Sequence, residues 1–210
     1  MTINVIPKAQ TLYKKTLEDY IKIYWQALCP IPKKDNPAWD NDGSKDGPFN
    51  NNVNTDLYML SPSTYPQTAV TRNIEVPSGK GLFIPVVSVV VSACETSLPL
   101  VETANKDQSS IDPSTLSLEL DGSSTDFDLY IFNPTDIGEF EVSFPTQDAI
   151  WKINHAGTCN AVAAGRYIWT EALSSGHHTV RFGGSLHCAP PEQCIETKYS
   201  EDITYNITVP

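Results

Sequence analysis

The longest hydrophobic run in the chain, residues 77–94, predicts a central β-strand. Val and Ile dominate the run, and apolar side chains occupy both its odd and its even positions. A strand that is apolar on both faces has to be covered on both faces. We therefore expect Val87 and Val89 to face one layer of the protein, and Val86 and Val90 to face the other.

A helical pattern marks residues 11–28, where apolar residues recur at steps of three and four and charged residues occupy the opposite side. Thr11 is the predicted N-cap, and Pro30 and Pro32 end the helix. An amphipathic helix with several lysines can bind a membrane surface or a protein partner. Aromatic residues at this spacing more often pack on a core, so we expect the helix to cover the β body and not to anchor the protein to a membrane.

The composition of residues 35–55 predicts a long acidic and Asn-rich loop. Asp40, Asp42 and Asp46 surround Gly43 there, in the manner of carboxylates in calcium-binding loops. Ser44 stands where such loops carry a further aspartate, and no glutamate follows at the twelfth position. Two interpretations remain open, a calcium site formed by the three aspartates and an Asx-rich turn that binds no ion.

Beyond this loop, β-patterned segments alternate with clusters of Pro, Gly, Asn and Asp. The predicted strands cover residues 56–61, 68–76, 81–94, 115–120, 127–133, 138–144, 162–170, 177–183 and 200–209. No crossover helices separate them, so we predict a mainly β fold, an antiparallel sandwich of jelly-roll or immunoglobulin-like topology. Residues 1–210 then form a single domain, with a helical arm (1–34), the acidic loop (35–55) and the sandwich (56–210).

Charge limits the class of partner. The chain of 210 residues has a net charge of −11, and its basic residues are concentrated at the N-terminus. Residues 1–34 contain six basic and two acidic residues, whereas residues 35–210 contain eight basic and 23 acidic residues. An acidic body argues against nucleic acid as a ligand, because phosphate contacts need a basic surface.

Cysteine usage bears on the compartment. Cys188 and Cys194 enclose a short Pro-containing loop and predict a local disulfide, whereas the pairing of Cys29, Cys94 and Cys159 stays open. No signal peptide or transmembrane segment opens the sequence, which leaves an intracellular protein and a processed, exported protein as alternatives. Because no zinc-type cysteine spacing occurs, we interpret the cysteines as disulfide-forming and expect an extracellular or cell-surface location.

Catalytic motifs are missing from the sequence. HExxH, phosphate-binding glycine loops and a dinucleotide fingerprint are absent, and the nearest approach to GxSxG, residues 183–187, ends in histidine. The histidines offer one metal hypothesis. If Gly183 and Gly184 form a two-residue hairpin turn, His178 and His187 lie diagonally on one sheet face and share a transition metal. The alternative is that both histidines bind no metal.

Three segments together resemble an uncharacterised family of predicted secreted bacterial and archaeal proteins. They are WQALCPIPKKDNPAWD (25–40), RNIEVPSGKGLFIPVV (72–87) and EALSSGHHTVRFGG (171–184). That family typically has a Trp-rich helix, an Asn-Pro-x-x-Asp loop, an Arg-x-Cys-x-Val-Pro-x-Gly-Lys strand and a Leu-x-x-Gly-x-His closing strand. Ile74 stands at the cysteine of this pattern. The resemblance implies a β-sandwich and export, and it brings no catalytic residue to this chain.

These observations favour an extracellular binding or surface-structural module, with a glycan or protein ligand, over an enzyme. Trp39, Tyr65 and Trp151 are the aromatic residues that we expect to stack on a glycan if they share a groove. No cofactor is expected apart from calcium in the aspartate loop. The alternative function is a metal-dependent enzyme of cupin-like shape that uses His178 and His187.

Overall fold

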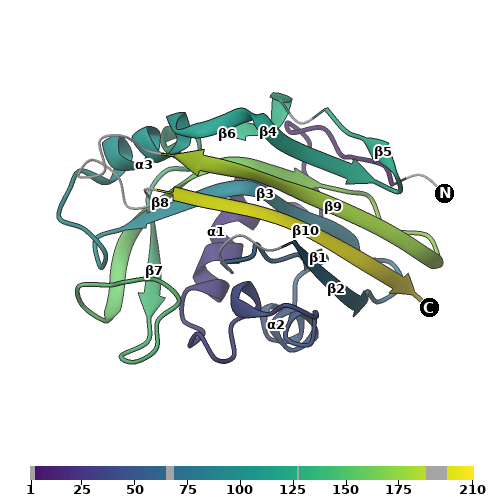
Figure 1. Ribbon diagram of the computed structural model, residues 1–210, viewed down its shortest axis with the longest axis horizontal. Coiled ribbons are helices and arrows are strands. Elements are labelled where there is room, and N and C mark those ends of the chain that lie inside the picture. The colour runs from purple at the N-terminus through teal and green to yellow at the C-terminus, as the bar shows by residue number, and fades with distance from the viewer. Residues whose placement is uncertain (1–2, 65–68, 127, 188–197) are drawn as a thin grey trace.

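Two mixed β-sheets and four α-helices make up the described part of the computed structural model, residues 3–64, 69–126, 128–187 and 198–210 (Figure 1). The first sheet has the order β1 (Leu57–Met59), β3 (Gly81–Ser92), β8 (Gly157–Trp169) and β6 (Ile131–Phe132), and β7 (Phe140–Phe144) also pairs with β8. The second sheet has the order β2 (Val70–Glu75), β10 (Lys198–Val209), β9 (Gly176–His187), β4 (Ile111–Leu120) and β5 (Ser123–Ser124). The helices are α1 (Leu17–Leu28), α2 (Asp46–Val53), α3 (Leu100–Ser109) and α4 (Pro134–Ile137). The mainly β prediction is confirmed.

The prediction of purely antiparallel sheets is wrong, because each sheet contains one parallel pair. β1 runs parallel to β3, and β2 runs parallel to β10. Between β1 and β3 the chain passes through β2 in the other sheet, and such a detour lets the chain re-enter the first sheet in the same direction. Spacing along the chain does not reveal this exchange between sheets.

Strand β3 is buried on both faces, as its sequence predicts. Val86 and Val90 belong to the main hydrophobic core, which also contains the buried face of α1. On the other face, Val87 packs with Ile111 and Leu186 of the second sheet. Further along, α3 covers the strand, where Ala104 packs with Val91 and Val162. Helix α3 was not predicted, and it shares the covering of β3 with α1.

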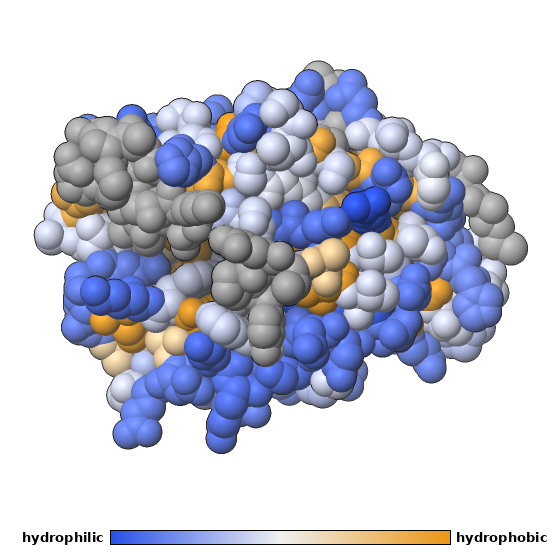
Figure 2. Space-filling view, in the orientation of Figure 1, coloured by the Kyte–Doolittle hydropathy of each residue, from blue (hydrophilic) through white to orange (hydrophobic). Residues whose placement is uncertain are grey.

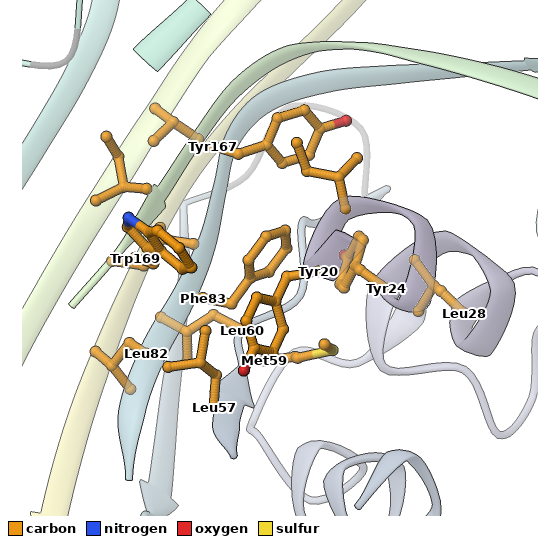
Figure 3. Close-up of a cluster of buried hydrophobic side chains, with 14 of the residues drawn as sticks. Tyr20, Tyr24, Leu28, Leu57, Met59, Leu60, Leu82, Phe83, Tyr167 and Trp169 are labelled. Atoms are coloured by element: carbon orange, nitrogen blue, oxygen red, sulfur yellow. The ribbon is translucent and has the colours of Figure 1, made fainter. Parts of the chain in front are cut away.

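The main core is aromatic where α1 meets the first sheet (Figure 3). The ring centroids of Tyr24 and Phe83 lie 5.2 Å apart, and those of Tyr20 and Trp169 lie 5.8 Å apart. All four side chains are fully buried. Burying one such side chain stabilises the folded state by roughly 1.5–3 kcal/mol. The apolar face of α1 is therefore part of the core, as predicted.

Helix α1 begins later than predicted. Tyr13 and Lys14 have φ angles of 52° and 67°, which are incompatible with an α-helix, and they form a tight turn after residue 11. Thr16, not Thr11, is the N-cap, and it forms a capping box with Asp19. The helix ends at Leu28 with Cys29 as its C-cap, two residues before the predicted stop at Pro30.

The predicted loop over residues 35–55 also contains helix α2. Its sequence, DGPFNNNV, has a low helix propensity, so the helix depends on tertiary contacts. Phe49 is buried in the main core, and the Asn50 side chain makes hydrogen bonds with both the backbone N–H and the backbone C=O of Met59.

Two β predictions need correction. A short 3₁₀ turn, Asp128–Tyr130, replaces most of the strand predicted for residues 127–133. The hairpin turn predicted at Gly183 and Gly184 is absent, because β9 runs straight through both glycines. A Cβ atom on Gly183 would lie 2.3 Å from the carbonyl oxygen of Glu201, so glycine serves close strand approach here and not a turn.

Candidate ligand-binding cleft

A cleft lies along the part of β3 that does not pair with β1. Strand β1 pairs only with Gly81–Phe83, and residues 87–90 of β3 border the cleft. The cleft is narrow, and the space open to a water-sized molecule between its walls is about 60 Å³. The lining comes from eight separate parts of the chain and consists of Trp25, Pro62, Thr64, Val87, Ser88, Val89, Val90, Glu95, Asp107, Trp151, Leu186 and Tyr199.

Two tryptophans form the aromatic part of the cleft. Trp25 comes from α1 and is held by a hydrogen bond of 2.9 Å from its Nε1 to the Tyr167 hydroxyl. Trp151 lies with its ring centroid 5.8 Å from that of Trp25 and 6.4 Å from that of Phe144. Trp151 is half-buried, so part of its ring remains accessible. These contacts fix both rings before any ligand binds.

Two carboxyl groups provide the polar part. Glu95 follows β3, and its Oε2 accepts hydrogen bonds from the Ser92 backbone N–H (3.1 Å) and hydroxyl (2.6 Å). Burial raises the pKa of Glu95 to about 7, the bonds from Ser92 oppose this rise, and the nearby charge of Asp107 adds to it. Asp107 is a buried residue of α3. Glu95 can therefore exist in the protonated form near neutral pH, which lets it donate as well as accept hydrogen bonds.

The three aromatic residues singled out from sequence do not share one groove in the described structure. Trp151 lines the cleft. Trp39 does not, and its ring is covered by Lys33, whose Nζ lies 3.5 Å from the ring centroid. Tyr65 lies outside the described residues. Trp25 also borders the cleft, and it is buried in the main core, as the helical pattern predicts.

The aspartates of the predicted calcium loop point to different partners. Asp40 Oδ2 accepts the Lys45 N–H at 2.9 Å, and Asp42 Oδ1 accepts the Ser44 N–H at 2.9 Å. These bonds are typical of the Asx-rich turn. Asp46 turns inward as the first residue of α2 and is fully buried. The structure therefore does not bring the three carboxylates together.

Asp46 belongs instead to a buried polar cluster around Arg72. The Arg72 guanidinium is fully buried, lies 3.8 Å from an Asp46 carboxylate oxygen, and donates to the carbonyl oxygens of Pro37 and Asp40. The Tyr205 hydroxyl donates to Asp46 at 3.2 Å. Burial raises the pKa of Asp46 to about 7, although Arg72 acts in the opposite direction. This cluster joins the loop after α1 to the second sheet, and sequence patterns had not revealed it.

The two histidines of the transition-metal hypothesis lie at opposite ends of β9. His178 and His187 are nine residues apart in one continuous strand, which corresponds to about 30 Å. His178 is buried, its Nδ1 lies 2.9 Å from Asp121 Oδ2, and its Nε2 lies 2.9 Å from the Ser174 carbonyl oxygen. His187 is exposed. A metal shared by these two histidines does not fit this geometry.

The Asp121–His178–Ser174 arrangement has the residue types of a hydrolytic triad, and Ser174 Oγ lies 3.3 Å from His178 Nε2. In a working triad, Nε2 accepts the serine proton. Here Nε2 lies closer to the Ser174 carbonyl oxygen, at 2.9 Å, than to the Ser174 hydroxyl. The contacts of His178 with Asp121 and Ser174 hold the turn before β9 in place.

The described cysteines form one disulfide, between Cys94 and Cys159, and Cys29 is a buried free thiol. The bond links the end of β3 to β8 and resolves a pairing that the sequence left open. The predicted Cys188–Cys194 bond lies outside the described residues. In the part of the chain that the structure describes, no helix has the length and apolar character required to span a bilayer.

Some of the cleft could have been found from sequence and some could not. Trp25 and Trp151 are conspicuous because large aromatics are rare outside cores and binding sites. Glu95 and Asp107 carry no signal, since one follows a strand and the other lies in a helix that the hydrophobic pattern does not reveal. Comparisons with protein-family models, curated proteins and solved structures found no match for this chain.

Proposed function

We propose that the protein is a binding module whose cleft takes a neutral glycan or a similar polyhydroxylated ligand. The proposal rests on one observation: Trp25 and Trp151 line the same cleft as the carboxyl groups of Glu95 and Asp107. Sugar rings have apolar C–H faces that pack on aromatic rings. They also have hydroxyl groups that form hydrogen bonds with carboxyl groups. The pocket chemistry thus combines apolar walls with a few polar groups, as ligand sites do.

A small ligand fits better than a broad protein partner. Among the described residues, the large hydrophobic side chains that count as exposed are Tyr13 and Leu98. On the face drawn in Figure 2, hydrophobic residues form small separate patches among hydrophilic ones. A stable protein–protein interface usually has a larger apolar centre. The net charge of −11 further disfavours anionic ligands.

The proposal includes an exported protein with a sandwich of jelly-roll or immunoglobulin-like type. The Cys94–Cys159 disulfide supports an oxidising compartment, where such bonds persist. Two sheets that share a hydrophobic core support a sandwich-like arrangement. The resemblance to a family of predicted secreted proteins is part of the same proposal.

Binding to an array of neutral oligosaccharides, followed by titration with the best ligand, tests the function. Trp151→Ala should weaken binding about tenfold, because loss of a stacked ring costs on the order of 1 kcal/mol or more. The matched control is Tyr13→Asn, which removes an exposed ring outside the cleft and keeps a residue that tolerates the positive φ of the turn. The control should leave affinity within about twofold of the parent.

Two results would contradict the proposal. One is a complete lack of glycan binding by protein that circular dichroism shows to be folded. The other is an equal effect of the Trp151 and Tyr13 substitutions on affinity, which would place the ligand elsewhere.

A further inference from the structure

We propose that Cys94, Cys159 and His155 form a zinc site when the Cys94–Cys159 disulfide is reduced. Among the residues that the structure describes, this is the one group of three potential metal ligands whose donor atoms all lie within 4.8 Å of one another. Thiolate sulfur and imidazole nitrogen are the ligands that Zn²⁺ prefers. In the oxidised protein the two sulfurs are bonded to each other and offer no thiolate.

The position of His155 already suits a shared metal. Its Nε2 lies 3.4 Å from the Sγ of Cys159. Sulfur and nitrogen ligands of tetrahedral zinc are about 3.6 Å apart, given bond lengths of about 2.3 and 2.0–2.1 Å. Hence only the two sulfurs need to separate, and rotation about the Cα–Cβ bonds of the two cysteines can achieve this.

Backbone contacts hold the histidine beside the sulfurs. The backbone N–H groups of Asn154 and His155 both donate to the carbonyl oxygen of Cys94, at 2.7 and 3.3 Å. The Asn154 side chain also donates to the carbonyl oxygen of Glu95, at 2.6 Å. His155 is exposed, whereas both cysteines are buried, so a metal ion can enter from the histidine side. The carbonyl oxygen of Gly157 lies 3.6 Å from Cys94 Sγ and can accept the S–H of the reduced form.

The chemistry is a reduction followed by a metal exchange. A dithiol reductant transfers two electrons and two protons to the disulfide, which yields the Cys94 and Cys159 thiols, while the dithiol closes into its own disulfide. Zn²⁺ then replaces the two thiol protons, which pass to solvent, and forms two Zn–S bonds. His155 Nε2 donates its lone pair, and water occupies the fourth position. The zinc-bound form is therefore available only after reduction.

The test uses the full chain with Cys188→Ser and Cys194→Ser, so that Cys94 and Cys159 are the remaining cysteines apart from the buried Cys29. After reduction and removal of the reductant, the protein should bind one equivalent of Zn²⁺ by competition with a chromogenic chelator. Co²⁺ should give an intense thiolate-to-metal absorption band. His155→Ala should weaken zinc binding at least tenfold, and the control His187→Ala, which changes an exposed histidine at the far end of β9, should leave it unchanged.

Far-UV circular dichroism of the same samples decides the remaining outcomes. Reduced, folded protein that binds no stoichiometric zinc overturns the proposal, as does equal zinc affinity of the His155→Ala variant. If reduction unfolds the protein, addition of zinc should restore the native spectrum, and failure to restore it also overturns the proposal. Oxidised protein should bind no zinc in any of these measurements.

Discussion

At the scale of single residues, Arg72 connects more distant parts of the chain than any sequence pattern suggests. Its guanidinium donates to carbonyl oxygens of Pro37, Asp40, Ser61 and Pro62 and faces the buried Asp46 carboxylate. The Pro37 and Ser61 oxygens each accept one further hydrogen bond, from the Asp40 N–H (3.1 Å) and from the Tyr205 hydroxyl (3.0 Å). An unpaired buried polar group costs about 1–3 kcal/mol, so Arg72 stabilises the loop segments around it.

We expect Arg72→Met to lower the free energy of unfolding by about 3–5 kcal/mol, because it removes the cation beside the buried Asp46 carboxyl group and the donor to several buried carbonyl oxygens. Denaturant unfolding measures this change. Asp46→Asn in the same chain should recover part of the loss, because it removes the uncompensated charge.

The matched control for this prediction is Arg181→Met. Arg181 also pairs with an aspartate, at 2.8 Å from Asp202, but both side chains are about half exposed. Exposed ion pairs contribute about 0–1 kcal/mol. A loss at Arg72 no larger than that at Arg181 would show that the buried cluster contributes little.

At the scale of elements, the cleft depends on a local irregularity in the pairing of β3 with β8. The register between them shifts between Pro85 and Val87, and Gly165 of β8 lies opposite Ser88 with φ +130°. A Cβ atom on Gly165 would lie 2.5 Å from the carbonyl oxygen of Val87. Glycine at this position therefore allows the strand segment that borders the cleft to approach β8 closely.

Gly165→Ala should destabilise the protein by about 2–3 kcal/mol, because it adds both backbone strain and a steric clash. Gly47→Ala is the control, since a Cβ atom on Gly47 of α2 meets nothing within 4 Å. The control should be neutral or stabilising by up to about 1 kcal/mol. Thermal unfolding of the two variants provides the comparison, and equal melting temperatures would contradict the role assigned to Gly165.

At the scale of the whole molecule, three buried carboxyl groups link stability to pH. Burial is the largest cause of the raised pKa in each case, to about 7 for Asp46 and Glu95 and to about 8 for Glu201. The folded protein therefore binds protons more tightly at these groups than the unfolded chain does. The stability that they contribute is complete below their unfolded pKa values, near 4, and is lost as the pH rises through 7 and 8.

We predict that the free energy of unfolding is larger at pH 5 than at pH 8.5, by at least about 3 kcal/mol. Urea unfolding at the two pH values measures the difference. Groups with a lowered pKa, such as Asp202 beside Arg181, act below pH 4 and lie outside this window. Glu201→Gln should reduce the difference, because glutamine does not titrate. A protein that is equally stable at both pH values would contradict the prediction.

The sequence alone determined the elements whose pattern of apolar and polar side chains lies within one continuous segment. The apolar residues on both faces of β3 require cover from two layers, and the three- and four-residue steps in α1 require a buried stripe. Pro30 has no backbone N–H to donate, so the sequence predicts that α1 ends before it, and the helix does end there. In the aspartate loop, Asp40 and Asp42 accept neighbouring backbone N–H groups, as Asx turns do.

Only the tertiary structure decided the features that join distant segments. Helix α2 forms although its Gly and Asn residues disfavour it, because Asn50 bonds to Met59. The two glycines of β9 read locally as a turn, yet they serve close packing against β10 and β4. The pairing of Cys94 with Cys159 and the cleft joining Trp25 to Trp151 depend on contacts between residues far apart in sequence. Periodicity describes how one segment is buried, whereas these contacts depend on which segments the folded chain brings together.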